Sequence, residues 1–181
     1  MIEMRILLAI TGASGLVYGR RLAEVLKADK TVSLSIVISK GARMVAEKEG
    51  TDLPKADYKE DDFSCPHASG SNPPDAMVVA PCSLKTLGEI SNGVGSSLIT
   101  RAAEVALKER KKLVLVVRET PYSLITIRNM ETVTLAGAVV LPASPGFYGK
   151  PESVDDMIDF VVARILDQLG ISNELSRRWK G

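Results

Sequence analysis

The sequence predicts an α/β protein in which a doubly wound parallel sheet, flanked by helices, forms a single domain over residues 1–181. Short aliphatic runs that are continuous rather than alternating are typical of parallel strands buried on both faces. Helical segments alternate with these runs, which implies right-handed β-α-β crossovers. Each run ends in glycines, small polar residues or charges. Because open parallel sheets bind ligands beyond the carboxyl ends of their strands, we expect the functional site at that edge.

The predicted strands share an aliphatic core of a few residues and a polar or glycine-containing end. In chain order they are residues 5–10, 32–38, 76–80, 113–117 and 138–141. The segments that follow them carry nearly all of the unusual chemistry of the chain. These segments are residues 11–15, 39–41, 81–83, 118–121 and 142–148.

The predicted helices have apolar residues at helical spacing. They are residues 16–26, 42–49, 83–90, 98–109, 121–130 and a last helix that begins near residue 153. Gly19 in the first of them would allow a close approach to the sheet. In the last, Ser153 and Asp156 resemble a capping box, and Gly170 stands where a C-terminal stop is expected.

One segment, residues 50–75, has no convincing periodicity and contains several prolines. An irregular stretch of this length in a compact domain is usually a functional lid or an interface segment. A disordered surface loop is the alternative interpretation. Residues 171–181 are predicted to form a C-terminal tail.

Charge and cysteine content narrow the classes of function. The 23 basic and 22 acidic residues nearly cancel, which gives no case for a nucleic-acid or anionic-membrane surface. No apolar stretch approaches the ~20 residues that span a bilayer, and the N-terminus lacks signal-peptide architecture. Two cysteines make neither a disulfide framework nor a metal site. We therefore expect a cytoplasmic protein without a bound metal.

The first glycine cluster has the spacing Gly12-x-x-Gly15-x-x-x-Gly19. Its backbone N–H groups, at the start of a helix, can approach an anion. The turn is similar to that of short-chain dehydrogenases, so a nicotinamide enzyme has to be considered. However, no tyrosine has a lysine four residues on, and Ser39 and Lys40 stand where an acidic residue would hold a ribose. A purely structural turn also stays open.

Longer motifs are more specific. They are residues 73–87 (PPDAMVVAPCSLKTL), 101–110 (RAAEVALKER), 118–123 (RETPYS), 145–148 (PGFY) and the closing Arg178-Trp179. In this order they resemble the flavin prenyltransferase (UbiX-like) family over nearly the whole chain. The resemblance implies a Rossmann-like flavoprotein that joins the dimethylallyl group of dimethylallyl phosphate to reduced FMN, at N5 and then by ring closure at C6. It further implies a homo-oligomer, a dodecamer with shared active sites, whose prenylated FMN serves a UbiD-type decarboxylase.

The resemblance also assigns residues. The implied FMN contacts are Gly12, Ala13, Ser14, Ser39, Ser83, Thr86 and Arg118. The implied dimethylallyl phosphate contacts are Lys108, Arg118, Tyr148 and Arg164, with Trp179 in the closing motif. Glu119 and Glu49 are the implied acid–base groups, and Ser14 is expected to hydrogen-bond near flavin N5. Cations can stabilise a departing phosphate and an aromatic face a developing allylic cation, and the chain has no Asp-rich D-D-x-x-D metal motif.

Two alternatives share the fold. One is an FMN-dependent decarboxylase of the phosphopantothenoylcysteine or peptidyl-cysteine type, and the other is a non-catalytic FMN carrier. The decarboxylases carry Pro-Ala-Ser-Ala-Asn-Thr where this chain has residues 80–83 (APCS), and a carrier needs no second phosphate site. His67 and Cys82 are weaker candidates, the latter because it is expected to be a small buried residue.

Overall fold

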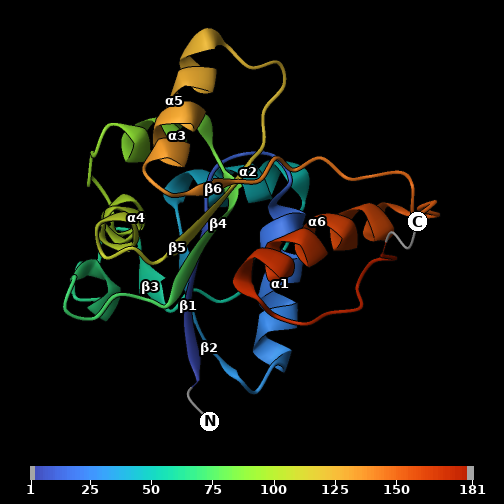
Figure 1. Cartoon of the computed structure of the whole chain (residues 1–181), viewed down its shortest axis with the longest axis horizontal. Coiled ribbons are helices and arrows are strands. Elements are labelled where there is room, and N and C mark those ends of the chain that lie inside the picture. Colours follow the sequence, from blue (N-terminus) through green and yellow to red (C-terminus); the bar gives the residue numbers. More distant parts are fainter. Residues whose placement is uncertain (1–2, 179–181) are drawn as a thin grey trace.

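A six-stranded, fully parallel sheet in the order β3-β2-β1-β4-β5-β6 forms the centre of the protein (Figure 1). The computed structural model describes residues 3–178. The strands are β1 (Met4–Ile10), β2 (Val32–Ile38), β3 (Tyr58–Lys59), β4 (Ala76–Cys82), β5 (Lys112–Val117) and β6 (Val139–Val140). The helices are α1 (Leu16–Ala28), α2 (Lys40–Glu49), α3 (Leu84–Ser91), α4 (Leu98–Lys108), α5 (Leu124–Leu135) and α6 (Val154–Leu169), with a 3-10 turn, η1 (Pro66–Ala68). The predicted doubly wound α/β class is confirmed.

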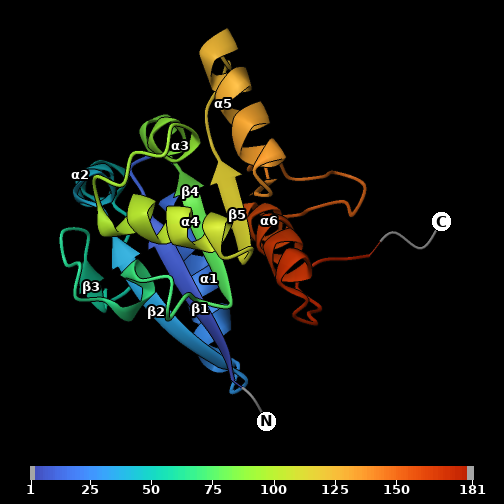
Figure 2. The same cartoon turned by 60° about the vertical axis from the view of Figure 1, so that its left-hand side comes forward.

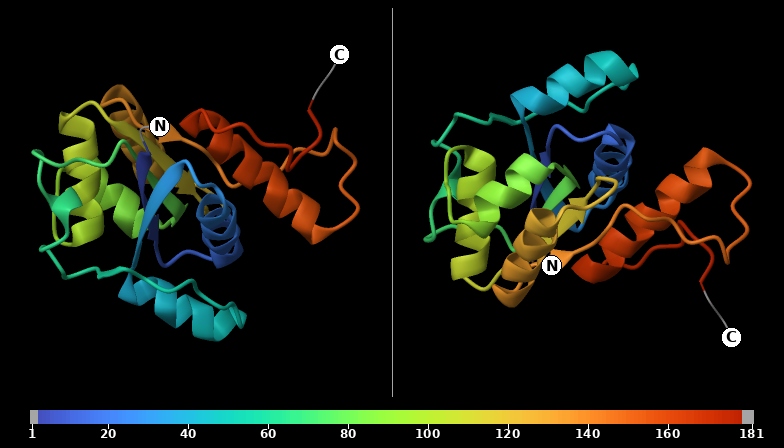
Figure 3. Two further views of the ribbon diagram at one scale, coloured as in Figure 1. Left: turned by 90° about the horizontal axis from the view of Figure 1, so that it is seen from below. Right: turned by 90° about the horizontal axis from the view of Figure 1, so that it is seen from above.

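Helices cover both faces of the sheet, so its central strands are buried on both sides. Helices α1 and α6 lie on one face and α3 and α4 on the other (Figure 2, Figure 3). In β1, Ile6, Leu8 and Ile10 pack toward α1 and α6, whereas Leu7 and Ala9 pack toward α3 and α4. All five are fully buried. This explains why the strands read as continuous aliphatic runs rather than alternating ones.

The ends of α6 follow the predicted signals. The Ser153 hydroxyl accepts from the Asp156 N–H while the Asp156 carboxylate accepts from the Ser153 N–H, which completes a capping box. Gly170 ends the helix in the left-handed region with φ 76°. No helix in residues 3–178 is long and apolar enough to cross a bilayer.

Several boundaries and one strand differ from the sequence expectations. Helix α5 begins at Leu124, three residues later than predicted, because Ser123 caps it by accepting from the Thr126 N–H. Strand β4 continues two residues beyond the predicted end, through Pro81 and Cys82. Strand β3 was not predicted, because its two residues are too few to show a period.

The segment 50–75 is held to the body at several points. The Leu98 N–H donates to the Glu60 carbonyl at 2.7 Å. Arg101 Nε donates to the Ala68 carbonyl at 3.1 Å. The guanidinium of Arg5 donates to the Asp75 carboxylate, at 3.2 Å from both Nε and Nη2. These contacts pin both halves of the segment, so the interpretation as a disordered loop finds no support in its packing.

The predicted close approach at Gly19 is confirmed, and it yields a stability test. A Cβ at Gly19 would collide with the backbone carbonyl oxygen of Ala80 in β4. By contrast, a Cβ at Gly88, inside α3, would have Asn129 Nδ2 as its nearest neighbour at 3.6 Å, an ordinary contact. We expect Gly19→Ala to lower the free energy of unfolding by about 1–3 kcal/mol. The matched variant Gly88→Ala should raise it by roughly 0.5–1 kcal/mol, the usual gain in a helix interior.

Urea denaturation followed by far-ultraviolet circular dichroism measures both changes. Opposite signs for the two glycines are the expected result. Equal stabilisation by both alanines would contradict the tight α1–β4 contact.

Candidate active site

Thr11 joins the ends of the two central strands and fixes the geometry of the carboxyl edge. Its side chain is buried, and its hydroxyl donates to the Pro81 carbonyl at 2.7 Å while it accepts from the Ser83 N–H at 2.8 Å. A second bond joins the Thr11 N–H to the same Pro81 carbonyl at 3.2 Å. The glycine turn after β1 and the start of α3 after β4 are thereby held side by side.

A cavity of about 390 Å³, called here the turn cavity, opens beside the glycine turn. It is lined by Gly12, Ala13, Ser14, Val45, Lys48, Glu49, Ser83, Leu84, Arg118 and Glu119. Two side chains reach the turn from other elements. Arg118 Nε, after β5, donates to the Ser14 carbonyl at 3.1 Å, and the Gly15 N–H donates to Glu49 Oε1 of α2 at 3.1 Å. The turn cavity therefore brings together an arginine and two carboxylates next to exposed backbone.

A second cavity, of about 570 Å³, adjoins the first and shares Gly12, Ser83, Leu84 and Glu119 with it. We call it the cap cavity, because the N-termini of three helices line it. Its remaining lining residues are Ser39, Lys40, Gly41, Glu60, Asp61, Lys85, Thr86, Glu89, Ser96, Ser97 and Ile99. Helices α2, α3 and α4 begin there, and helix N-termini carry partial positive charge that favours an anion. Four carboxylates also line the cavity, those of Glu60, Asp61, Glu89 and Glu119, so an anion would have to bind at the N-termini and away from them.

Serine caps each of these three helices. Ser39 Oγ accepts from the Ala42 N–H, Ser83 Oγ from the Thr86 N–H, and Ser97 Oγ from the Thr100 N–H, at 3.0–3.3 Å. A hydroxyl that accepts as a cap still carries its own proton. The Ser39 hydroxyl can therefore donate to a ligand in the cavity without giving up its cap. The hydroxyls of Ser83 and Thr86 lie 3.0 Å apart and bond to each other. The roles of Ser39, Ser83 and Thr86 as ligand contacts stay predictions.

Glu119 is not paired with the neighbouring Arg118 in the described chain. One carboxylate oxygen, Oε1, accepts from the Thr120 N–H at 2.9 Å, and the side chain lines both cavities. Glu119 thus occupies the boundary between the two spaces. An ordinary ion pair with Arg118 does not account for its position.

Lys40 lies at the mouth of the cap cavity. Its ammonium is 3.7 Å from Asp61 and 4.0 Å from Glu60, and its side chain is 77% exposed. Such exposed pairs contribute little to stability. The ammonium can therefore change partners at low cost.

Cys82 and His67 are buried side chains that lie outside both cavities. Complete burial raises the pKa of the Cys82 thiol to about 12, which keeps it protonated and unreactive at neutral pH. His67 is buried in η1, where Nδ1 lies 3.3 Å from the Asn72 carbonyl, and burial lowers its pKa. Neither side chain lines the turn cavity or the cap cavity.

Tyr148 lies in the loop before α6 and Arg164 lies on α6, and neither lines the two cavities. The ring of Tyr148 packs edge-on against Phe160, with centroids 5.8 Å apart. Arg164, one helical turn after Phe160, lines a separate cavity of about 300 Å³ beside residues 139–142. Both side chains are about half exposed.

Lys108 lies at the other end of the sheet within one chain. It is the last residue of α4, its side chain lies against Gly70, and its ammonium contacts Glu109. The following strand, β5, begins at Lys112, so Lys108 is near the amino ends of the strands. The implied phosphate contacts are thus distributed over three separate places. Trp179 lies outside the described residues.

Several residues of the site were not anticipated, and three of them show why. Thr11 gives no signal of its own, because its role depends on a carbonyl 70 positions away. Lys48 lines the turn cavity and was missed as one charge on an amphipathic helix. Ser97 was detectable, because it opens a capping box with Thr100.

Comparison with known proteins agrees with this geometry. A family model described as Flavoprotein matches residues 1–166. A flavin prenyltransferase UbiX of Methanocaldococcus jannaschii is 48% identical over 183 aligned residues, which cover 97% of this chain and 98% of the relative.

Solved structures show the same relationship. AnUbiX (PadA1), in complex with FMN and dimethylallyl pyrophosphate, superposes with a TM-score of 0.93 at 43% identity, covering 99% of this chain and 98% of that one. A dodecameric FMN-dependent UbiX-like decarboxylase from Escherichia coli O157:H7 has a TM-score of 0.93 at 40% identity, covering 98% of this chain and 100% of that one. The FMN-dependent cysteine decarboxylase TvaF is only 21% identical, with a TM-score of 0.61 over 76% of this chain and 88% of that one, and shares the fold alone.

Proposed function

The chain belongs to the flavin prenyltransferase UbiX family, and we propose from this membership that it joins a dimethylallyl group from dimethylallyl phosphate to reduced FMN. The observation that carries the proposal is the pair of adjoining cavities at the carboxyl edge of the sheet. One offers three capped helix N-termini, and the other offers Arg118 between two carboxylates. A ligand with a phosphate at one end and a planar, polar ring at the other fits this arrangement.

We assign the flavin phosphate to the cap cavity and the ring to the turn cavity. The N–H groups at the start of α2 and α3 and the hydroxyls of Ser39 and Ser83 are suitable donors for phosphate oxygens. Gly12 and Ala13 leave room for a ring, since neither has a long side chain. A Cβ at Gly12 would come within 2.8 Å of the Gly41 backbone, so the two turns approach as closely as glycine permits.

Prenyl transfer breaks the allylic C–O bond of the donor, releases phosphate and replaces a proton on the flavin. We assign phosphate stabilisation to Arg118 together with Lys108, Tyr148 and Arg164. We assign the proton to Glu119, because its carboxylate lies at the boundary of the two cavities. The order of bond formation, at N5 and then at C6, follows from the family resemblance.

Two further residues assist in this assignment. Glu49 holds the Gly15 N–H and so fixes the glycine turn, from which it can also share a proton with the flavin. Ser14 is exposed, and its carbonyl accepts from Arg118. We assign its hydroxyl a hydrogen bond near N5 rather than the role of a nucleophile. Trp179, implied as a substrate contact, retains that assignment from the sequence.

Incubation of the protein with reduced FMN and dimethylallyl phosphate, read by mass spectrometry, tests the proposal. A flavin heavier by one C5H8 unit is the expected product. The related E. coli structure is described as a decarboxylase, so loss of carbon dioxide from an aromatic or thiol-bearing acid is the second candidate function. Decarboxylation without any flavin mass gain would support it, and FMN binding with neither reaction would indicate a carrier.

Glu119→Gln isolates proton handling from binding. The amide keeps the shape and one acceptor oxygen but removes the charge and basicity, so both ligands should still bind. We expect product formation to slow by about 10²–10⁴-fold, the usual contribution of a general acid–base group. Single-turnover mass spectrometry measures the rate, and Glu24→Gln on α1, away from both cavities, is the control. An unchanged rate in Glu119→Gln would remove this residue from the chemistry.

Arg118→Ala tests flavin binding directly. The variant loses the charged donor beside Ser14, and we expect FMN affinity to fall by about 1.5–3 kcal/mol, the range for a hydrogen bond to a charged group. Titration calorimetry measures the affinity. Arg20→Ala on α1 removes an arginine that lines neither cavity and should bind FMN as the wild type does. Tight binding of NADPH with no binding of FMN would contradict the assignment of the cavities.

We also propose that the chain forms a closed homo-oligomer, a dodecamer, in which neighbouring subunits complete each active site. Within one chain, none of Lys108, Tyr148 and Arg164 lines the two cavities. Helix α5 supports this proposal, because it buries only Thr126 and Val133 while Leu124, Ile125, Ile127 and Leu135 are 50–82% exposed. Size-exclusion chromatography with light scattering should give a mass many times 19.4 kDa. A monomer that catalyses the reaction would exclude shared sites.

We infer that prenylated FMN leaves this enzyme for a UbiD-type decarboxylase, and that both work in the cytoplasm. The two free cysteines are buried and unpaired, as suits a reducing compartment. The downstream partner follows from the family resemblance.

A further inference from the structure

One carboxylate on α6, that of Asp167, is shared by two arginines. Arg164 Nη1 donates to Asp167 Oδ2 at 2.6 Å. Arg178 Nη1 and Nη2 donate to the two carboxylate oxygens, each at 2.7 Å. Asn173 Nδ2 adds a weaker contact to Oδ1 at 3.3 Å. The side chain of Asp167 is only 19% exposed, so these bonds are partly shielded from water.

The bond from Asp167 fixes the direction of the Arg164 guanidinium. Among the described residues, Asp167 is the hydrogen-bonding partner of Arg164, and Nη1 is the nitrogen used. Nε and Nη2 are then left to face a ligand, and a guanidinium presents such a pair of N–H groups as a flat fork that matches phosphate. Arg164 borders a cavity of about 300 Å³, where this fork can be used.

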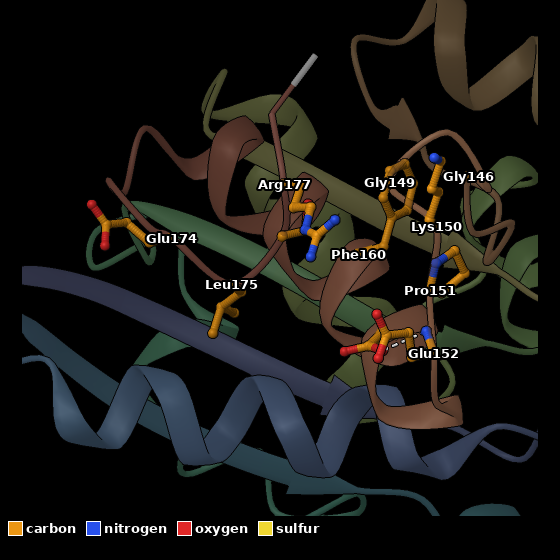
Figure 4. Close-up of a pocket in the computed structure, with 11 residues that line it drawn as sticks. Gly146, Gly149, Lys150, Pro151, Glu152, Phe160, Glu174, Leu175 and Arg177 are labelled. Atoms are coloured by element: carbon orange, nitrogen blue, oxygen red, sulfur yellow. Dashed lines mark hydrogen bonds between the residues drawn. The ribbon is translucent and has the colours of Figure 1, made fainter. Parts of the chain in front are cut away.

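The same carboxylate fastens the chain that follows α6. After Gly170, residues 171–178 fold back so that Arg178 makes its paired bonds to Asp167 and also donates to the Asn173 carbonyl at 3.3 Å. This tail forms one wall of a cavity of about 400 Å³. Figure 4 shows Leu175 and Arg177 of the tail on one side and Lys150 and Pro151 of the loop before α6 on the other.

The charge balance keeps this junction intact at neutral pH. The hydrogen bonds from Arg178, and then the positive charges of Arg178 and Arg164, lower the pKa of Asp167, so the group stays ionised. Arg164 and Arg178 share the single negative charge of Asp167. Asp167 therefore cannot neutralise both guanidiniums, and net positive charge remains at Arg164. An arginine held in this way stays attractive to a phosphate.

We propose that Asp167 is a positioning residue for the donor substrate: it orients Arg164 toward the phosphate of dimethylallyl phosphate and, through Arg178, couples the order of the tail to that orientation. The substrate part of this inference rests on the proposed function. The coupling of Asp167 to the tail does not.

Asp167→Asn tests the inference, because the amide has the same shape without the charge. We expect the KM for dimethylallyl phosphate to rise about tenfold, the lower end of the effect of losing a charge-assisted hydrogen bond. The kcat and the affinity for FMN should not change, since Arg118 and Glu119 are untouched. Hydrogen exchange of the amides in residues 171–178 should be faster than in the wild type.

Asp159→Asn is the matched control. Asp159 is also on α6, its side chain is 21% exposed, and it forms a paired ion contact with Arg21 at 2.7 and 3.1 Å. Loss of this contact should lower thermal stability to a similar degree but leave the KM and the exchange of residues 171–178 at their wild-type values. Asp167→Ser, which is also uncharged, takes the place of Asp167→Asn if that variant does not fold.

A wild-type KM in the Asp167 variant would overturn the positioning role, and so would an equal rise in KM in Asp159→Asn. Wild-type exchange of residues 171–178 in the Asp167 variant would overturn the coupling to the tail. A wild-type protein that adds no C5H8 unit to FMN would contradict the proposed function, whereas faster exchange of the tail in Asp167→Asn would still hold.

Discussion

The burial of β1 and β4 on both faces is the constraint on which the rest of the structure depends. Side chains in these strands cannot be polar without losing hydrogen bonds to water, so polar groups are confined to the strand ends. Thr11, at the end of β1, is a buried polar residue. Its hydroxyl is fully hydrogen-bonded, because it donates to the Pro81 carbonyl and accepts from the Ser83 N–H. That one side chain holds the glycine turn and α3 in register, and both cavities form around the junction.

The sequence indicates the fold well, because the relevant signals are local. Continuous aliphatic runs locate the long strands, and the Ser153–Asp156 capping box and Gly170 locate the ends of α6. Strand β3 gives no such signal. Its two residues, Tyr58 and Lys59, form a strand only because they pair with β2, which the local sequence does not show. The site is predictable only in part. Residues that follow strands, such as Ser39 and Arg118, lie at the same edge of a parallel sheet. The separation of Lys108 from them depends on the direction of α4, which the strand pattern does not give.

The cap cavity offers hydrogen-bond donors that do not belong to flexible cations. Three helix N-termini supply fixed partial charges, and their serine caps hold them at defined positions. Backbone N–H groups lose little conformational entropy on binding, whereas a lysine or arginine must be immobilised. Two cations at the edges of cavities differ in how firmly they are held. Arg164 donates to Asp167 at 2.6 Å, whereas Lys40 makes only long, exposed contacts to Glu60 and Asp61.

Helix α5 has a consequence for how the chain matures. It projects from the body and has few buried side chains (Figure 1), so an isolated, newly synthesised subunit presents a row of leucine and isoleucine side chains to its surroundings. If copies of the chain dock over α5 as proposed, collision with any other apolar surface would compete with that docking, and aggregation would grow with the concentration of unassembled chains. The yield recovered from denaturant should then depend on protein concentration, and chaperones that shield α5 should raise it.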